Sequence, residues 1–166
     1  TFTVQSVDGT THAITITITG TNDAATFDAG TGKDAGGVTE DATDPTLSTS
    51  GTLTVTDVDG VAQSAINASV SPVASAGALG SLSINASGAW TYTVPNASVQ
   101  YLAAGETKIE TFTVQSVDGT THAITITITG TNDAATFDTG AGKDAGGVTE
   151  DATDPTLSTT GTLTVT

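Results

Sequence analysis

Apolar and polar residues alternate strictly along several short stretches of this chain. In residues 121–129 three isoleucines fall on one side and threonines on the other, which is the period-2 pattern of a half-buried β-strand. Residues 110–117 alternate in the same way, and the Asp-Gly pair at 118–119 lies between the two stretches. Asp-Gly between alternating runs is a strong hairpin signal. We therefore predict a β-hairpin here and a second copy of it around the Asp-Gly pair at 8–9.

Further alternating stretches predict the rest of a small β domain. Residues 80–84 and 89–94 form a second predicted hairpin, which Pro95 ends because proline cannot donate to the ladder. The other predicted elements are, in chain order, a short strand at 38–40, a strand at 51–56, a weaker strand at 65–73 and one or two helical turns at 98–104. About seven short strands separated by turn signals, with no alternating helices, predict an all-β fold of the immunoglobulin-like antiparallel sandwich type.

Three details of this sandwich are also predicted from residue type. Trp90 is expected in the core rather than in a ligand site, and Val99 and Leu102 should cover an open end of the core. The glycine-rich stretch 27–37 is expected to be a surface loop. Glu106 and Glu110 flank Lys108 and are expected to form a solvated strand edge.

The pattern repeats at the period of one domain. Residues 1–56 return as residues 111–166, and the two copies differ only at three positions, Ala29/Thr139, Thr31/Ala141 and Ser50/Thr160. An offset of this size is typical of a tandem array of small β domains. We divide the chain into the C-terminal hairpin of a preceding repeat (1–23), a complete repeat (24–133) and the N-terminal part of a next repeat (134–166). Because both ends fall inside alternating runs, we expect the chain to be a window from a longer protein.

Composition narrows the possible functions. The chain has no Cys, so neither disulfides nor thiolate-bound zinc stabilise it. It has no apolar run of about 18 residues, so this segment has no predicted membrane span. Eighteen Asp and Glu residues face three Lys and no Arg, which gives a formal net charge of −15. Such a chain lacks the cations that phosphate binding requires, so we expect no nucleic-acid partner.

The acidic residues are clustered rather than scattered. We expect the topology to bring five of them to one end of the domain, where the incoming linker arrives: Asp23, Glu40, Asp57, Asp59 and Asp118. Several carboxylates in a small region require a counter-ion or raised pKa values. Oxygen-only ligands at this density suit Ca²⁺, whereas Zn²⁺ would require His or Cys. The alternative interpretation is an ordinary Asp-x-Asp-Gly turn without metal. With calcium, ligands from both sides of the linker would lock the angle between neighbouring domains.

Several of these stretches resemble the VCBS-type repeats of large bacterial RTX-type surface adhesins, a cadherin-like and immunoglobulin-like group. The matching stretches are 38–41, 51–60, 80–92, 110–114, 118–120 and 124–134, in the family's order. The resemblance implies extracellular, cell-anchored extender modules that bind Ca²⁺ at their junctions, and by position it supports the five acidic residues as ligands. Residues 26–37 and 61–79 match less well.

Three functions are compatible with the sequence. The first is a structural spacer, whose partners are the neighbouring repeats of the same chain. The second is a module that binds a carbohydrate or a protein, which would require an exposed aromatic platform from Trp90, Tyr92 and Tyr101. The third is binding to ice or another surface through a row of threonines, Thr125, Thr127 and Thr129, which a twisted sheet disfavours.

We expect no enzyme activity. His12 and His122 are equivalent positions without a His or Cys partner, and a surface or edge role is expected for both. The half-repeats at the two ends cannot rebuild a whole domain, because together they lack the counterpart of 57–110. Their edges are expected to be open to chain–chain contacts by strand addition.

Overall fold

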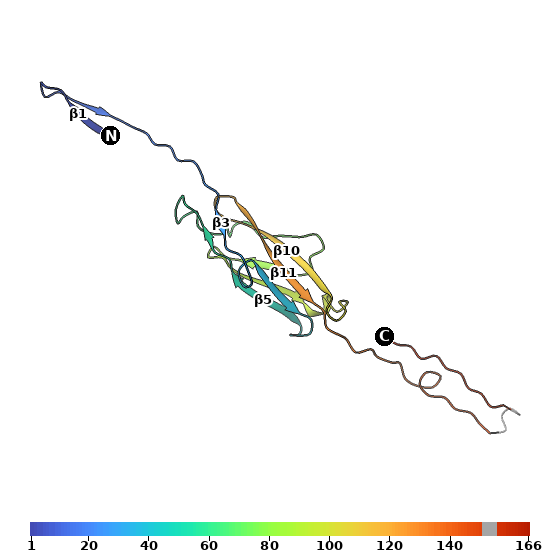
Figure 1. Ribbon diagram of the computed structural model, residues 1–166. Helices are drawn as coiled ribbons and strands as arrows, with labels where there is room; N and C mark the ends of the chain where they lie inside the picture. The colour runs from blue at the N-terminus through green and yellow to red at the C-terminus, as the bar shows by residue number, and fades with distance from the viewer. Residues whose placement is uncertain (151–155) are drawn as a thin grey trace.

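A two-layer β-sandwich occupies the middle of the chain in the computed structural model, which describes residues 1–150 and 156–166 (Figure 1). A separate hairpin precedes the sandwich and an irregular segment follows it. The elements are β1 (Phe2–Gln5), β2 (Thr11–Ile14), β3 (Thr26–Phe27), β4 (Ala35–Thr39), β5 (Thr46–Thr52), β6 (Val55–Thr56), β7 (Val73–Ala74), β8 (Ser81–Ile84), β9 (Ala89–Pro95), the 3₁₀ helix η1 (Asn96–Ser98), β10 (Thr107–Gln115) and β11 (Thr121–Thr129).

The strands form two main sheets that face each other. One sheet has the order β4-β11-β10-β7 and the other β5-β9-β8, while β3 pairs with β6. Among the strands named above, the pairing of β4 with β11 is parallel and the other pairings are antiparallel. The predicted hairpins at 118–119 and 85–88 are both confirmed, and the fold is the predicted all-β, immunoglobulin-like sandwich.

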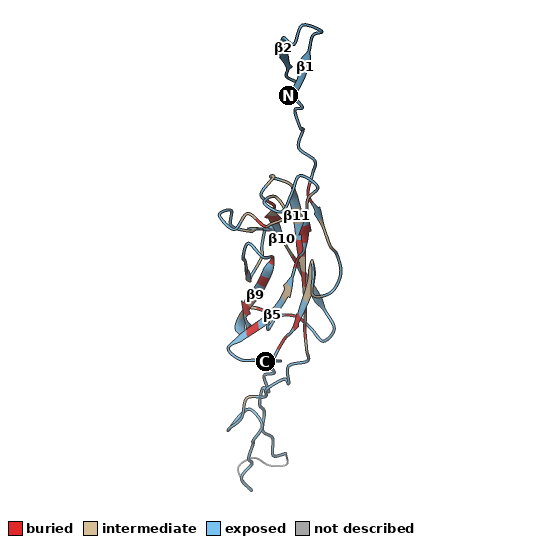
Figure 2. Cartoon of the chain, turned by 90° about the vertical axis from the view of Figure 1, so that its left-hand side faces the viewer, coloured by how far each residue is buried: buried red, intermediate tan, exposed pale blue. Residues whose placement is uncertain are grey.

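The core lies between the inward faces of the two sheets (Figure 2). Its largest fully buried apolar side chains are Trp90, Tyr92, Phe112, Leu47, Leu53, Ile66, Ile124, Ile126, Ile128 and Val94. Burial of each such side chain contributes about 1.5–3 kcal/mol relative to exposure. The prediction for the end of the core is also confirmed, because Val99 and Leu102, which follow η1, are buried.

The position of Glu110 differs from the one predicted from the sequence. It was expected on a solvated strand edge, yet it is fully buried, whereas its neighbour Glu106 is exposed as expected. Its carboxylate accepts hydrogen bonds from the amides of Leu79 and Gly80, at 2.6 and 3.2 Å, and from the Tyr92 hydroxyl at 2.8 Å. These three donors replace water, which makes burial of the acid tolerable.

Several predicted elements have different limits in the structure. The strand expected at 38–40 is β4 (Ala35–Thr39), and the helical turns expected at 98–104 are replaced by η1 (Asn96–Ser98). The strand expected at 51–56 begins earlier, as β5, and is interrupted before β6. The interruption coincides with a hydrogen bond from the Leu53 amide to the Gly88 carbonyl, which ties the chain to the β8–β9 turn. The weak strand expected at 65–73 is reduced to an isolated bridge at Ile66 and the two residues of β7.

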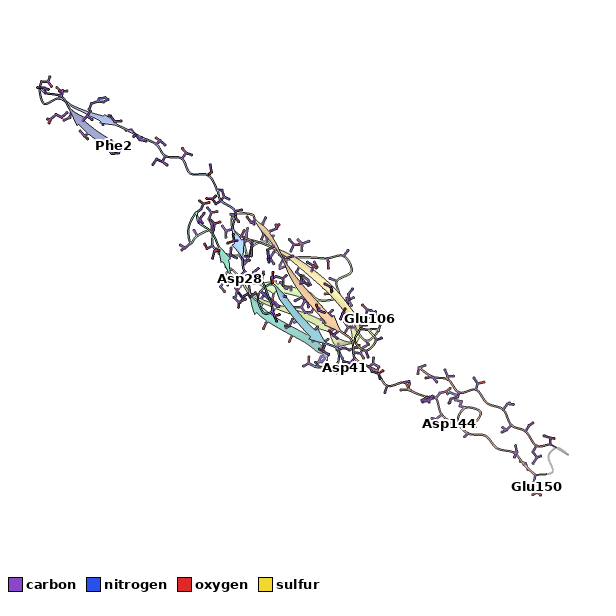
Figure 3. The ribbon with its side chains drawn as sticks, in the orientation of Figure 1. Phe2, Asp28, Asp41, Glu106, Asp144 and Glu150 are labelled. Atoms are coloured by element: carbon purple, nitrogen blue, oxygen red, sulfur yellow. The ribbon has the colours of Figure 1, made fainter. Side chains whose placement is uncertain are left out.

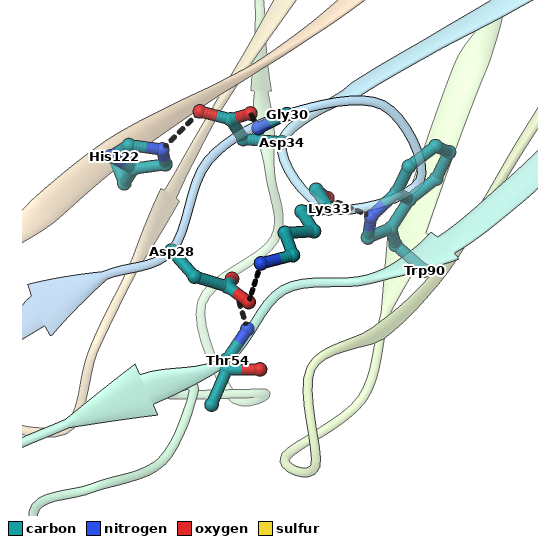
Figure 4. A network of polar contacts seen from close by, with 7 residues as sticks. All are labelled: Asp28, Gly30, Lys33, Asp34, Thr54, Trp90 and His122. Carbon is teal, nitrogen blue, oxygen red and sulfur yellow. Dashed lines mark hydrogen bonds and ion pairs between the residues drawn. The ribbon is translucent and has the colours of Figure 1, made fainter.

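The glycine-rich stretch is a surface loop over residues 28–34, as expected, but its last residues belong to β4. The loop also ties the two sheets together (Figure 4). The indole nitrogen of Trp90 donates to the Lys33 carbonyl at 2.6 Å, and Lys33 forms an ion pair with Asp28 at 3.3 Å. Farther along, Asp34 contacts the His122 ring nitrogen at 3.0 Å, and that ring stacks on Phe27. The contacts of His122 are therefore structural ones at the start of β11.

Candidate metal sites at the two poles

Four of the five predicted metal ligands gather where the linker enters the sandwich, at the end that we call the entry pole (Asp23, Asp57, Asp59 and Asp118). β6 ends at Thr56 and so delivers the Asp57–Asp59 turn to this end. The amide of Asp59 donates to Asp57 Oδ1 at 2.7 Å, and the amide of Asp23 donates to Asp59 Oδ2 at 2.7 Å. The first bond lies within the turn, and the second connects the incoming linker to the turn, 36 residues away in sequence.

Asp118 connects the linker to the β10–β11 hairpin. Its carboxylate accepts hydrogen bonds from the Ser116 hydroxyl, from the Thr120 amide and hydroxyl, and from the amide of Ala25 at 2.9 Å. These donors, with Ser116 the strongest and Thr120 next, hold the pKa of Asp118 far below its ordinary value. The carboxylate is therefore ionised throughout the physiological pH range.

Asp57 has one oxygen without a partner among the residues that the structure describes. Its Oδ1 accepts the Asp59 amide, whereas Oδ2 is buried and makes no hydrogen bond. A buried carboxylate oxygen without a donor is costly unless something else neutralises it. The entry pole thus presents a buried negative oxygen that a cation would satisfy.

Glu40 does not join this group, so the expected convergence of five acids is wrong at this one position. The expectation requires a first strand that begins at the entry pole. β4 instead runs parallel to β11, with Val38 opposite Ile128 and Thr39 opposite Thr129. Both strands therefore end together, and Glu40 lies at the opposite end of the sandwich, where the chain leaves.

That opposite end, the exit pole (Glu40, Asp41, Asn96, Gln100 and Thr131), holds a second acidic cluster. Figure 3 shows Asp41 at this end, close to the departing chain. Asp41 adopts the left-handed conformation, with φ of 59°. Its Oδ1 accepts hydrogen bonds from the side-chain amides of Asn96 and Gln100, at 2.8 and 3.0 Å, which hold its pKa below the ordinary value. A non-glycine residue in this conformation is uncommon and often marks a functional position.

Glu40 binds the departing linker through one oxygen only. Its Oε2 accepts the amide of Thr131 at 2.8 Å, while its Oε1 is buried without a hydrogen-bond partner in the described residues. Each pole therefore has one orphaned, buried carboxylate oxygen, on Asp57 and on Glu40. Across residues 1–150 and 156–166, no group of three or more acidic or histidine side chains is disposed to hold a metal ion by itself.

The linkers at the two poles have the same sequence. Thr131-Asn132-Asp133 leaves the exit pole, and Thr21-Asn22-Asp23 enters the entry pole. The first residue of this tripeptide is held by Glu40 at the exit pole, and the third is held by Asp59 at the entry pole. A linker between two complete repeats would contain both anchors.

The sequence predicts no metal-site role for Asn96 or Gln100, and Asp41 is not among the five predicted ligands. Asp41 directly follows Glu40, so an acidic pair was visible. Nothing in the sequence indicated that Asn96, 55 residues away, would donate to it. That contact depends on β9 and η1 ending beside the β4–β5 connection.

The fold places the protein among the immunoglobulin-like β-sandwich domains. Residues 22–130 match the family described as the bacterial cadherin-like domain. The chain belongs to this family. None of the curated proteins compared with the chain matches it.

Membership in this family points to an extracellular repeat of the adhesin type. Cadherin-like domains are typically structural modules without enzymatic activity, and they generally bind Ca²⁺. In the described residues we find no helix long and apolar enough to cross a membrane. The closer resemblance to VCBS-type repeats of RTX adhesins stays a prediction, as do the domain limits 1–23, 24–133 and 134–166.

Proposed function

We propose that this chain is part of a surface-exposed bacterial adhesin, in which the repeats act as spacers that Ca²⁺ stiffens at each junction. The ion would be held by the exit pole of one repeat together with the entry pole of the next. Glu40 and Asp41 would contribute from one side of the junction, and Asp57, Asp59 and Asp118 from the other. Asp23 or its counterpart Asp133, in the linker, lies between them.

The observation that carries this proposal is the double anchoring of the linker. Thr131 is held by Glu40, and the counterpart of Asp133, which is Asp23, is held by Asp59. Only Asn132 separates the two anchored residues. Two Cα–Cα steps of 3.8 Å span at most about 7.6 Å. Consecutive poles are therefore expected to lie in direct apposition.

Apposition of two acidic poles requires a positive counter-charge. Two like charges about 4 Å apart repel by about 1 kcal/mol in water and by about 4 kcal/mol near a protein surface. Neither pole contributes a Lys or Arg to its hydrogen-bond network, and the chain has only three basic residues besides its two His. A divalent cation would replace this repulsion by attraction to both sides of the junction.

The donor atoms available fit calcium. They are carboxylate oxygens, two of which are buried without a partner, on Glu40 and Asp57. Ca²⁺ takes six to eight oxygen ligands in flexible geometry, whereas Mg²⁺ retains more water and Zn²⁺ prefers nitrogen and sulfur. Bound at the junction, the ion would supply electrostatic cross-linking only. The side chains of the two poles would orient it and set the angle between repeats.

A ligand-binding module is the weaker alternative. Two of the three aromatic residues that could build a platform, Trp90 and Tyr92, are buried in the core, which leaves only Tyr101 exposed. A single exposed aromatic side chain offers little stacking area for a sugar. This supports the spacer over carbohydrate recognition.

The experiment requires a chain with one complete junction. Residues 1–166 followed by a second copy of residues 57–133 contain two complete consecutive repeats, and we call this the two-repeat chain. Calcium at 100 times its dissociation constant should stabilise the folded form by about 2.7 kcal/mol. Small-angle scattering should show a longer, stiffer particle with calcium than with chelator. Identical melting and scattering in both conditions would refute the calcium role.

A matched pair of variants tests the assignment of the poles. Glu40→Gln alters the exit pole that faces the second repeat, whereas Glu150→Gln makes the same change at the counterpart position, which faces no further repeat. We expect Glu40→Gln to weaken calcium binding about tenfold or more, a loss of about 1.4 kcal/mol. Glu150→Gln should leave the affinity at the complete junction unchanged. Equal effects of the two variants would refute a junction site that includes Glu40.

A further inference from the structure

The exit pole carries an exposed aromatic side chain next to the departing linker. Tyr101 is 63% exposed and is the only exposed aromatic residue of the complete repeat. A surface depression beside it is lined by residues 100–104 together with the linker residues Thr131, Asn132 and Asp133. Since Val99 and Leu102 are buried on either side of it, the backbone that carries Tyr101 is well anchored.

The entry pole carries exposed apolar side chains next to the arriving linker. Val58 and Val61 are 82% and 93% exposed, and both lie in the connection that follows β6. A surface depression in this region is lined by Asp59 and Gln63 together with the linker residues Gly20, Thr21 and Asn22. The same connection holds the linker, because Asp59 accepts the Asp23 amide.

The two depressions share one linker sequence. Thr-Asn of the linker faces residues 100–104 at the exit pole and faces Asp59 and Gln63 at the entry pole. Between two consecutive repeats there is a single Thr-Asn pair. It would therefore line the exit-pole depression of the first repeat and the entry-pole depression of the second. Tyr101 of one repeat and the 58–61 connection of the next are thus brought within reach of each other.

We propose that Tyr101 packs directly against Val58 and Val61 of the following repeat, which forms an apolar contact beside the acidic junction. The occupant of this surface is the next copy of the repeat, since the linker anchors leave only one free residue between the two poles. The inference rests on the proposed tandem spacer, but the contact itself involves no metal ligand. A tyrosine ring suits this position because it offers a large apolar face and a hydroxyl that can remain in water.

This contact would have a different effect from that of the cation. Charge neutralisation draws the two poles together without a strong preference for rotation about the linker. A ring wedged against two valines on one side of the linker would select one rotation, because apolar packing depends on shape. The contact therefore assigns Tyr101 to setting the twist between successive repeats.

Cross-linking between engineered cysteines tests the contact, since the chain has no native Cys. In the two-repeat chain with excess calcium, Tyr101→Cys in the first repeat is combined with Val61→Cys in the second, and a short bismaleimide is added. The control replaces Tyr101→Cys by Val73→Cys, which is similarly exposed but lies on β7, paired with Thr113 on the side of the sandwich. We expect the first pair to cross-link within the chain about tenfold faster, because its effective concentration is higher.

The cross-linking result and the calcium result can fail independently of each other. Cross-linking rates within about twofold of the Val73 control would overturn the Tyr101 contact, even if calcium stiffens the array. Rapid, specific cross-linking supports the contact, even if chelation leaves melting and scattering unchanged. Intrinsic fluorescence of the buried Trp90 verifies that each cysteine variant is folded before cross-linking.

Discussion

Glu110 provides a direct test of how the core tolerates a buried acidic side chain, because only its three hydrogen-bond donors replace the water that it loses on folding. Glu110→Gln preserves the shape of the side chain but replaces one acceptor oxygen by an NH₂ group. The remaining oxygen can still accept the Leu79 amide, which donates at 2.6 Å in the wild-type chain. The Tyr92 hydroxyl can reorient to accept a hydrogen bond, whereas the Gly80 amide can only donate and is left unpaired.

The magnitude follows from these contacts. An unsatisfied buried amide costs about 1–3 kcal/mol, and loss of charge on the acceptor of the Leu79 bond removes about 1 kcal/mol more. We therefore expect Glu110→Gln to lower the free energy of unfolding by about 2–4 kcal/mol. In a domain of about 110 residues, whose total stability is typically about 5–15 kcal/mol, this is a large fraction. The melting temperature should fall by roughly 10–20 °C.

Urea unfolding followed by fluorescence of Trp90, the only Trp in the chain, measures this loss in the one complete repeat. Glu106→Gln is the matched control, since Glu106 is exposed, and it should change stability by less than about 0.5 kcal/mol. Tyr92→Phe removes one donor to the same carboxylate, so the double variant with Glu110→Gln should be non-additive by about 1 kcal/mol. If Glu110→Gln costs no more than Glu106→Gln, the Glu110 carboxylate is not a stabilising buried acceptor for Leu79, Gly80 and Tyr92.

Two further predictions concern the backbone and pH. Gly88→Ala should lower the free energy of unfolding by more than about 3 kcal/mol, because the φ of Gly88 is positive and a Cβ would overlap the Leu53 carbonyl. Gly77 has a similar φ but open space around it, so Gly77→Ala should cost only about 1–2 kcal/mol. Equal losses of stability in urea unfolding would contradict the steric explanation. The hydrogen bond from Ser116 makes the largest contribution to lowering the pKa of Asp118 in the folded chain. The contribution of the ionised carboxylate to stability is therefore complete above the ordinary pKa of 3.8 and is lost as pH falls through the lower pKa of the folded state. The stability advantage of the wild-type chain over Asp118→Asn should therefore shrink below about pH 4, and a constant difference in urea midpoint would count against it.

Alternation and turn chemistry were sufficient to predict most of the strands. The β10–β11 hairpin follows from isoleucines at every second position and an Asp-Gly turn, both of which act within a few residues. Sequence pattern could not place Glu40, because its position depends on which strand β4 pairs with and in which direction. Parallel pairing with β11, about 90 residues away, sends Glu40 to the exit pole.

The alternating sequence pattern also could not predict which acidic residues are buried. Glu110 occupies an inward position of β10, in line with Phe112 and Val114, but its charge indicated exposure. Only the approach of Leu79, Gly80 and Tyr92 supplies the donors that compensate for desolvation. The orphaned oxygens of Glu40 and Asp57 likewise become visible only when the surrounding chain is in place.

The repeated segments separate local from tertiary control within a single molecule. The hairpin of β1 and β2 has the same sequence and register as that of β10 and β11, with Phe2 opposite Ile14 as Phe112 is opposite Ile124. Its turn forms without any neighbouring sheet, so the sequence by itself determines the turn and the register.

Burial and strand length differ between the two copies. Phe2 is 63% exposed, whereas Phe112 is 2% exposed, and β2 ends at Ile14 whereas β11 continues to Thr129. β11 packs against the second sheet and pairs with the parallel strand β4, whereas β2 has neither neighbour. The sequence determines which side chains can share a face and how the chain turns. The tertiary structure decides which faces are buried and which charges meet, because both depend on surfaces contributed by segments far away along the chain.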